Sequence, residues 1–225
     1  MSTCAAIIVA AGSSRRAGFD KLLAMLAGQR VLERSIRAFA ASPSVGEIVV
    51  VCPAERFAQL ELSDLAHRGI IRVDGGAERH DSVKNGLAAL SYEPDVVAVH
   101  DGARPLISIE QIEKCIAVAL DCGCATSAHP ITDTLKRGDD AGFCTPELVE
   151  RENLWAMETP QVFRYSLLVQ AYAEVVKKNK LVTDEVSALQ LIGKKTKFVD
   201  NDTQNPKITW AGDIEFAEIL LQHRS

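Results

Sequence analysis

Short apolar segments of strand length alternate with amphipathic helical patterns through the first half of this chain. The strand-like segments cover residues 5–9, 47–52, 70–73 and 96–100, and helical spacing of apolar residues covers 31–41, 54–66 and 80–90. This alternation predicts an α/β fold, built on a doubly wound, mostly parallel sheet with helices on both faces. Ligands in such folds bind beyond the carboxyl ends of the strands.

The second half of the chain has a different pattern. From about 126 to 161 it lacks helical periodicity and is rich in turn residues, which predicts extended segments and hairpins that leave the main sheet. Helical patterns return at 165–178, 183–192 and 212–222, with a strand near 197–199. We therefore expect one Rossmann-like domain, 1–225, that carries an arm at about 136–160.

Composition narrows the classes of function. A net charge of −5 argues against nucleic acid as the main partner. We expect no membrane association, because no apolar run approaches the ~20 residues that span a bilayer and no signal-peptide pattern is present. The six cysteines form no C-x-x-C pair, so reduced thiols and a cytoplasmic location are expected.

The first strand-like segment leads into a turn of small residues, Ala10-Ala11-Gly12-Ser13-Ser14, which Arg15 and Arg16 follow. Small residues let a ligand approach backbone N–H groups, and guanidinium groups bind phosphate. The turn is thus a candidate site for a nucleoside triphosphate; the alternative is a tight turn with two solvated arginines. Its sequence matches neither the P-loop nor the dinucleotide-binding motif, which disfavours ATPase chemistry and hydride transfer.

Two further loops follow predicted strands. In the first, Gly75 and Gly76 permit close backbone approach and Ser82 begins the next helix, so the loop could bind an anionic or carbonyl group. The alternative is a glycine-rich turn with a capped helix. In the second, Asp101 leaves a buried strand and could hold Mg²⁺, while Arg104 could bind a phosphate or hydroxyls. The alternative there is an Asp101–Arg104 ion pair.

Together these segments resemble the 2-C-methyl-D-erythritol 4-phosphate cytidylyltransferase family over nearly the whole chain, from Ile7 to about Glu218. The resemblance rests on an ordered set of motifs: A-A-G-x-x-x-R at 10–16, G-G-x-x-R-x-x-S-V-x-x-G-L at 75–87, H-D-G-A-R-P at 100–105, D-T-x-K at 133–136, R-x-x-L-W-x-x-x-T-P-Q at 151–161, T-D-E-x-S-A-L at 183–189 and N-x-K-[IV]-T at 205–209.

The resemblance implies a role for each matching position. Nucleotide-binding residues would be Ala10, Ala11, Gly12, Ser13, Gly76 and Ser82. Catalytic residues would be Arg16, Lys21, Arg151 and Lys207, of which the first two stabilise charge on the α-phosphate and the departing pyrophosphate. Residues around the acceptor would be Asp101, Arg104, Thr134, Thr159 and Thr183, with Asp101 also serving Mg²⁺. The arm would build a homodimer and carry Arg151 into the partner's site.

One segment departs from the family pattern. The family usually has P-K-Q after a longer linker from the loop arginine, whereas Phe19-Asp20-Lys21-Leu22-Leu23 follows a shortened linker here. Lys21 is the candidate catalytic lysine, and either Arg15 or Arg16 can be the matching arginine.

The reaction that the resemblance implies is transfer of CMP from CTP to 2-C-methyl-D-erythritol 4-phosphate, with release of pyrophosphate, in the non-mevalonate isoprenoid pathway. Two alternatives remain at this point. One is a cytidylyltransferase for another sugar phosphate, such as ribitol 5-phosphate. The other is a non-catalytic nucleotide-binding module, and its only support is the altered segment around Lys21.

Overall fold

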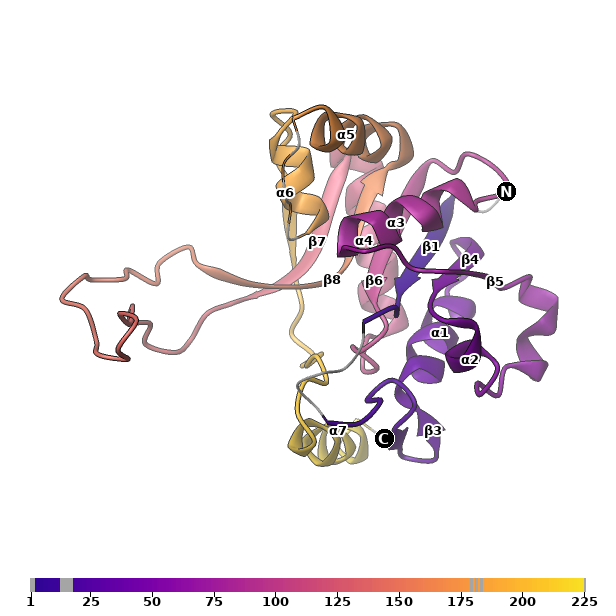
Figure 1. Ribbon diagram of the computed structural model, residues 1–225, viewed down its shortest axis with the longest axis horizontal. Coiled ribbons are helices and arrows are strands. Elements are labelled where there is room, and N and C mark those ends of the chain that lie inside the picture. Colours follow the sequence, from indigo (N-terminus) through magenta and orange to yellow (C-terminus); the bar gives the residue numbers. More distant parts are fainter. Residues whose placement is uncertain (1–2, 13–17, 179, 181, 183, 225) are drawn as a thin grey trace.

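A seven-stranded sheet forms the centre of the computed structural model, which describes residues 3–12, 18–178, 180, 182 and 184–224 (Figure 1). The strand order is β5-β4-β1-β6-β8-β7-β9. The strands are β1 (Cys4–Val9), β4 (Val45–Val51), β5 (Ile71–Val73), β6 (Val96–Asp101), β7 (Cys124–Pro130), β8 (Trp155–Arg164) and β9 (Lys197–Asp200). Only β8 runs antiparallel to its neighbours β6 and β7 among these pairings; the others are parallel. The predicted mostly parallel α/β sheet is confirmed.

Helices cover both faces of the sheet because successive strand residues point in opposite directions. Ile8 of β1 packs in a core with α1 (Val31–Ala41), α4 (Ile109–Cys122) and α7 (Gly212–Gln222). Its neighbour Ile7 packs in a second core with α3 (Arg79–Ala88), α5 (Tyr165–Lys177) and α6 (Glu185–Gln190). Both side chains are fully buried, as expected for strands covered on two faces.

The secondary structure differs from the sequence-based expectation in four places. The helix expected at 54–66 is two short helices, α2 (Ala54–Phe57) and the 3-10 helix η1 (Ser63–Arg68), and a small hairpin of β2 (Met25–Leu26) and β3 (Gln29–Arg30) precedes α1. Helix α4 was not expected at all. The extended segments expected to leave the sheet at 126–161 instead begin and end inside it, because most of β7 and β8 pair there.

The arm is the segment between β7 and β8, residues 131–154, which projects far from the sheet in Figure 1. Residues 155–160, expected in the arm, belong to β8, so the arm begins and ends earlier than the range 136–160. Its only regular pairing among the described residues is a bridge between Gly138 and Cys144. Phe143 and Leu148 are 72% and 73% exposed, so the arm carries large apolar side chains with little cover in one chain.

All six cysteines are free thiols, four buried in the cores and two, Cys122 and Cys144, exposed. Burial raises the pKa of Cys4 and of Cys115 to about 12, which keeps these two thiols protonated. Among the described residues, no helix combines the length and the apolar character needed to cross a bilayer.

Candidate active site

The carboxyl ends of β1, β4 and β6 lie side by side at one edge of the sheet. Val9 is the register partner of both Val51 in β4 and Asp101 in β6. Parallel strands with aligned ends bring the loops that follow them together. The turn after β1, the glycine loop after β5 and the segment after β6 therefore meet at this edge, as the sequence predicted.

The turn after β1 lies directly against the glycine loop. A Cβ on Gly75 would lie 2.3 Å from the Cβ of Ala11 and 3.1 Å from the Oγ of Ser82, so no larger residue fits there without a shift. The Gly76 N–H donates to the Ser82 hydroxyl at 3.1 Å. Ser82 is buried and thus shapes the glycine loop from within α3. Ser13 and Arg16, both predicted site residues, lie outside the described residues.

Asp101 sits between two cations at the end of β6. Its Oδ1 accepts from Arg79 Nη2 at 3.2 Å and its Oδ2 from Lys207 Nζ at 2.7 Å. Burial alone would raise the pKa of this carboxyl, but the charges of Arg79 and Lys207 hold it well below its usual range. The alternative arrangement, an ion pair between Asp101 and Arg104, does not form; Asp101 pairs with Arg79 and Lys207 instead.

Arg79 also contacts a second buried carboxylate. Its Nη1 donates a hydrogen bond to the Oε1 of Glu185, a fully buried residue at the start of α6, and the Tyr172 hydroxyl donates to the same oxygen at 2.9 Å. Burial lowers the pKa of Arg79, but the charges of Glu185 and Asp101 more than offset it, so the net pKa is raised. Arg79 is therefore a permanent cation that links α3, α6 and β6.

Thr159 lies beneath this ion cluster, where it supports Asp101 and the neighbouring His100. The Asp101 N–H donates to the Thr159 hydroxyl at 3.1 Å, and His100 Nε2 lies 3.1 Å from the Arg104 carbonyl, which can only accept. Burial lowers the pKa of His100 to about 4, so its ring is neutral. Nδ1 must then accept from the Thr159 hydroxyl, 2.9 Å away, so that hydroxyl's proton is already engaged.

Arg104 is directed at the backbone of the chain around it. Its guanidinium donates to the Asn205 carbonyl at 2.8 Å and to the Met157 carbonyl at 3.2 Å. The Asn205 side chain in turn donates to the Thr159 carbonyl at 3.2 Å. These bonds fix the loop that carries Lys207 against β8. Burial lowers the pKa of Arg104, although it remains far above neutrality.

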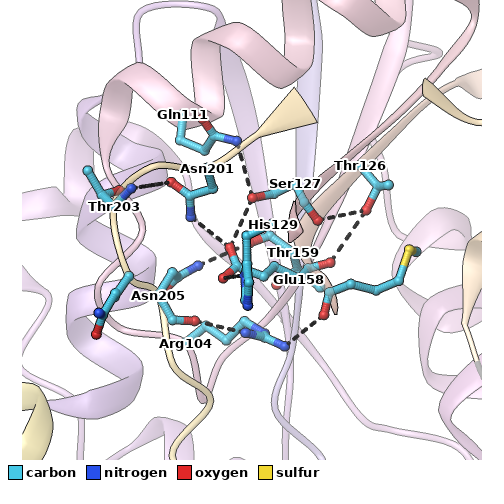
Figure 2. Close-up of polar contacts among 12 residues, drawn as sticks. Arg104, Gln111, Thr126, Ser127, His129, Glu158, Thr159, Asn201, Thr203 and Asn205 are labelled. Carbon is cyan, nitrogen blue, oxygen red and sulfur yellow. Dashed lines mark hydrogen bonds and ion pairs between the residues drawn. The ribbon is translucent and has the colours of Figure 1, made fainter. Parts of the chain in front are cut away.

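A buried carboxylate, Glu158, ties the same loop to β7 (Figure 2). It accepts from Ser127 at 3.1 Å and from Asn201 at 2.7 Å, and it pairs with His129 at 3.1 Å. A carboxylate that is only 3% exposed needs such donors to offset its lost hydration. The polar groups of Figure 2 thus form a support under the end of β6 and the loop of Lys207.

The remaining predicted residues lie elsewhere. Lys21 is partly buried in the segment that leads to α1, directly after Asp20. Thr134 and Arg151 lie in the arm and are exposed, and Arg151 donates to the Thr132 carbonyl within the arm. Thr183 lies outside the described residues. Within one chain, Lys207 and Asp101 are therefore in contact, whereas the hydrogen bond of Arg151 lies within the arm.

Sequence reasoning gave no role to two arginines that the structure places at the site. Arg79 lies within the glycine-loop motif, and its position three residues before Ser82 is the one local signal for a role at the site. Arg56, which contacts the turn after β1, lies in a stretch that looked like an ordinary amphipathic helix. Nothing in its local pattern distinguishes it from a surface arginine.

The residues present fit a divalent cation only when substrate oxygens complete its coordination. Nowhere in the described parts of the chain do three His, Cys, Asp or Glu side chains converge to form a metal site. Asp101 is the carboxylate at the strand ends that was expected to bind the cation. Its two oxygens contact Arg79 and Lys207. A cation such as Mg²⁺, held by one or two carboxylates plus phosphate oxygens, matches this donor set.

Thr159→Val should destabilise the protein, because the variant leaves the Asp101 N–H and His100 Nδ1 without their buried partner. We expect a loss of about 1–3 kcal/mol in the free energy of unfolding, measured by urea denaturation. Thr159→Ser keeps the hydroxyl and serves as the control. Equal stability of the Val variant and the natural protein would show that the hydroxyl is not the link described here.

Comparison with known proteins places this arrangement in one family. The family model described as 2-C-methyl-D-erythritol 4-phosphate cytidylyltransferase matches residues 4–223. The enzymes of that name from Alkaliphilus oremlandii and Pelotomaculum thermopropionicum are 36% and 38% identical; the matches cover 100% of this chain and 97% and 96% of those enzymes.

Solved structures agree with the sequence matches. The crystal structure of the enzyme of the same name from Francisella tularensis superposes with a TM-score of 0.84 at 28% identity, covering 97% of this chain and 100% of that one. The crystal structure of the enzyme of that name from Thermus thermophilus superposes with a TM-score of 0.80 at 28% identity. The match covers 99% of this chain and 100% of that one. Because the family model matches residues 4–223 and a full-length relative is 36% identical, this chain belongs to the 2-C-methyl-D-erythritol 4-phosphate cytidylyltransferase family.

Proposed function

We propose that the edge of the sheet described above carries out the reaction that defines the family, with the nucleotide on the loops after β1 and β5 and the acceptor near Asp101 and Lys207. The reaction transfers CMP from CTP to 2-C-methyl-D-erythritol 4-phosphate and releases pyrophosphate. The observation that carries this assignment is the ion cluster of Arg79, Asp101 and Lys207, which lies beside the turn of small residues at the same strand ends.

The reaction requires charge stabilisation more than proton transfer. A phosphate monoester is already ionised at neutral pH, so its oxygen can attack the α-phosphorus without a general base. The P–O bond to the leaving group breaks and pyrophosphate departs with the bonding electrons. Two polyanions must be brought together, so positioning and fixed cations should supply most of the rate enhancement.

The cations assigned to this work come from separate segments of the chain. We assign Lys21 and Arg16 to the α-phosphate and the departing pyrophosphate, and Lys207 to the acceptor phosphate. Nucleotidyl transfer generally uses a divalent metal, and we propose Mg²⁺, which would be held by phosphate oxygens with help from Asp101 and would neutralise phosphate charge. Binding of phosphate near Lys207 would compete with its ion pair to Asp101.

The arm completes this proposal through a second copy of the chain. Arg151 and Thr134 lie in the exposed arm, together with the uncovered side chains of Phe143 and Leu148. A homodimer that buries these side chains would present the arm to the partner's strand ends. We propose that Arg151 and Thr134 serve the acceptor site of the other subunit.

A substrate panel tests the function directly. Mg²⁺-dependent pyrophosphate release should occur with CTP and 2-C-methyl-D-erythritol 4-phosphate, and not with ATP, GTP or UTP or without acceptor. Ribitol 5-phosphate is included because related chemistry uses it, although the family match does not favour it. Release with ribitol 5-phosphate alone would overturn the acceptor assignment, and no release from protein that binds CTP would indicate a non-catalytic module.

Lys21→Ala should lower kcat by on the order of 10²–10³, because a cation that stabilises the leaving group contributes mainly in the transition state. Lys177→Ala, which removes a largely exposed lysine at the end of α5, is the matched control and should leave kcat unchanged. Circular dichroism checks that both variants fold. A Lys21→Ala enzyme with nearly normal turnover would remove Lys21 from the mechanism.

Mixing two inactive variants tests whether Arg151 acts across the dimer. Lys21→Ala and Arg151→Ala protomers should each be poorly active alone. A mixed dimer would contain one site with both native residues, so random exchange of subunits should restore about a quarter of the sites. If Arg151 served its own subunit, mixing would restore no activity.

A further inference from the structure

Arg56 is a buried cation that contacts the turn after β1 from the side of β4. It lies in α2, which begins three residues after β4 ends, and it is 8% exposed. Its Nη1 donates a hydrogen bond to the Ala10 carbonyl, and its Nη2 donates to the Gly12 carbonyl at 3.2 Å. Its Nε donates to the Asp20 carboxylate at 2.8 Å.

These three acceptors belong to two stretches of chain that flank residues 13–17 in the sequence. Ala10 and Gly12 precede that segment, and Asp20 follows it, directly before Lys21. Asp20 also accepts from the Leu22 N–H at 3.1 Å, and the Leu22 carbonyl accepts from α1 through the Leu32 N–H at 3.0 Å. One guanidinium therefore fixes the start of the turn relative to the residues around Lys21.

The contact with Ala10 also sets the direction of the next N–H group. The Ala10–Ala11 peptide is trans, so its N–H points away from its carbonyl. Because that carbonyl faces Arg56, the Ala11 N–H faces away from Arg56. Ala11 lies against Gly75 on the glycine loop. Arg56 thus orients a backbone donor at the junction of the two loops that we assign to the nucleotide.

A buried guanidinium needs all its donors satisfied, and a planar fork with several donors can bind three acceptors at fixed angles. We propose that Arg56 is a positioning residue for CTP: it holds the turn of Ala10 and Gly12 in register with Lys21, so that backbone donors and the lysine meet the same triphosphate. This inference rests on the proposed function, since it takes these loops as the nucleotide site.

The test compares Arg56→Met and Arg56→Lys with the natural enzyme. We expect kcat/KM for CTP to fall on the order of 10²-fold in the Met variant, as for other displacements of about 1 Å at a reacting centre, with the KM for the acceptor unchanged. Arg56→Lys keeps the charge but not the fork, so an intermediate loss is expected. The Lys variant also provides the answer if the Met variant fails to fold.

Arg68→Met is the matched control. Arg68 is partly buried and donates to the Val45 carbonyl at 2.6 Å, at the opposite end of β4, so its loss should affect stability without changing kcat/KM for CTP. The dissociation constant for CTP, measured by calorimetry on the same proteins, makes the result independent of the acceptor. If Arg56→Met and Arg56→Lys lost stability as Arg68→Met does but bound and used CTP normally, the positioning role would be refuted.

Discussion

The carboxylate of Asp101 is the interaction on which the arrangement of the site depends. It lies at the end of a buried strand, where a charge is costly unless cations offset the lost hydration. Arg79 and Lys207, 22 and 106 residues away along the chain, supply that compensation. By satisfying one carboxylate, the chain brings the start of α3 and the loop after β9 to the end of β6.

A second layer of polar contacts holds this cluster in place. Thr159, His100 and Arg104 link the backbone of β6 to β8 and to the loop that carries Lys207, and Glu158 anchors the same loop to β7. A site that works by electrostatic stabilisation benefits from such support, because its charges need not reorganise during the reaction. Arg56 provides the corresponding support on the nucleotide side.

The sequence predicted the parallel part of the fold well because its physical signals are local. Apolar strand segments and helical periodicity located β1, β4, β5 and β6, and the helix expected at 31–41 matches α1 residue for residue. These local signals fail where tertiary packing determines the strand pairing. Strand β8 is antiparallel in a sheet that is otherwise parallel, and the turn-rich pattern at 126–161 gives no sign that parts of this segment pair within the sheet.

The site residues likewise divide into those that local sequence signals predict and those that tertiary contacts determine. The loops of Ala11, Gly75 and Asp101 could be predicted because strand ends in a parallel sheet converge. The partners of Asp101 could not, since Arg104 is nearer in sequence than Arg79 or Lys207 but turns toward backbone carbonyls. Arg56 gives no local signal, because its significance comes from the acceptors that β1 and Asp20 bring to it.

In the proposed reaction, an oxygen of the acceptor's phosphate attacks the α-phosphorus of CTP at these strand ends. This step can be tested with acceptor labelled with ¹⁸O in the terminal phosphate oxygens, followed by ³¹P NMR of the products. All of the label should stay in the new diphosphate, including its bridging oxygen, and the pyrophosphate should carry none. Label in the pyrophosphate, or release of labelled inorganic phosphate, would contradict this step.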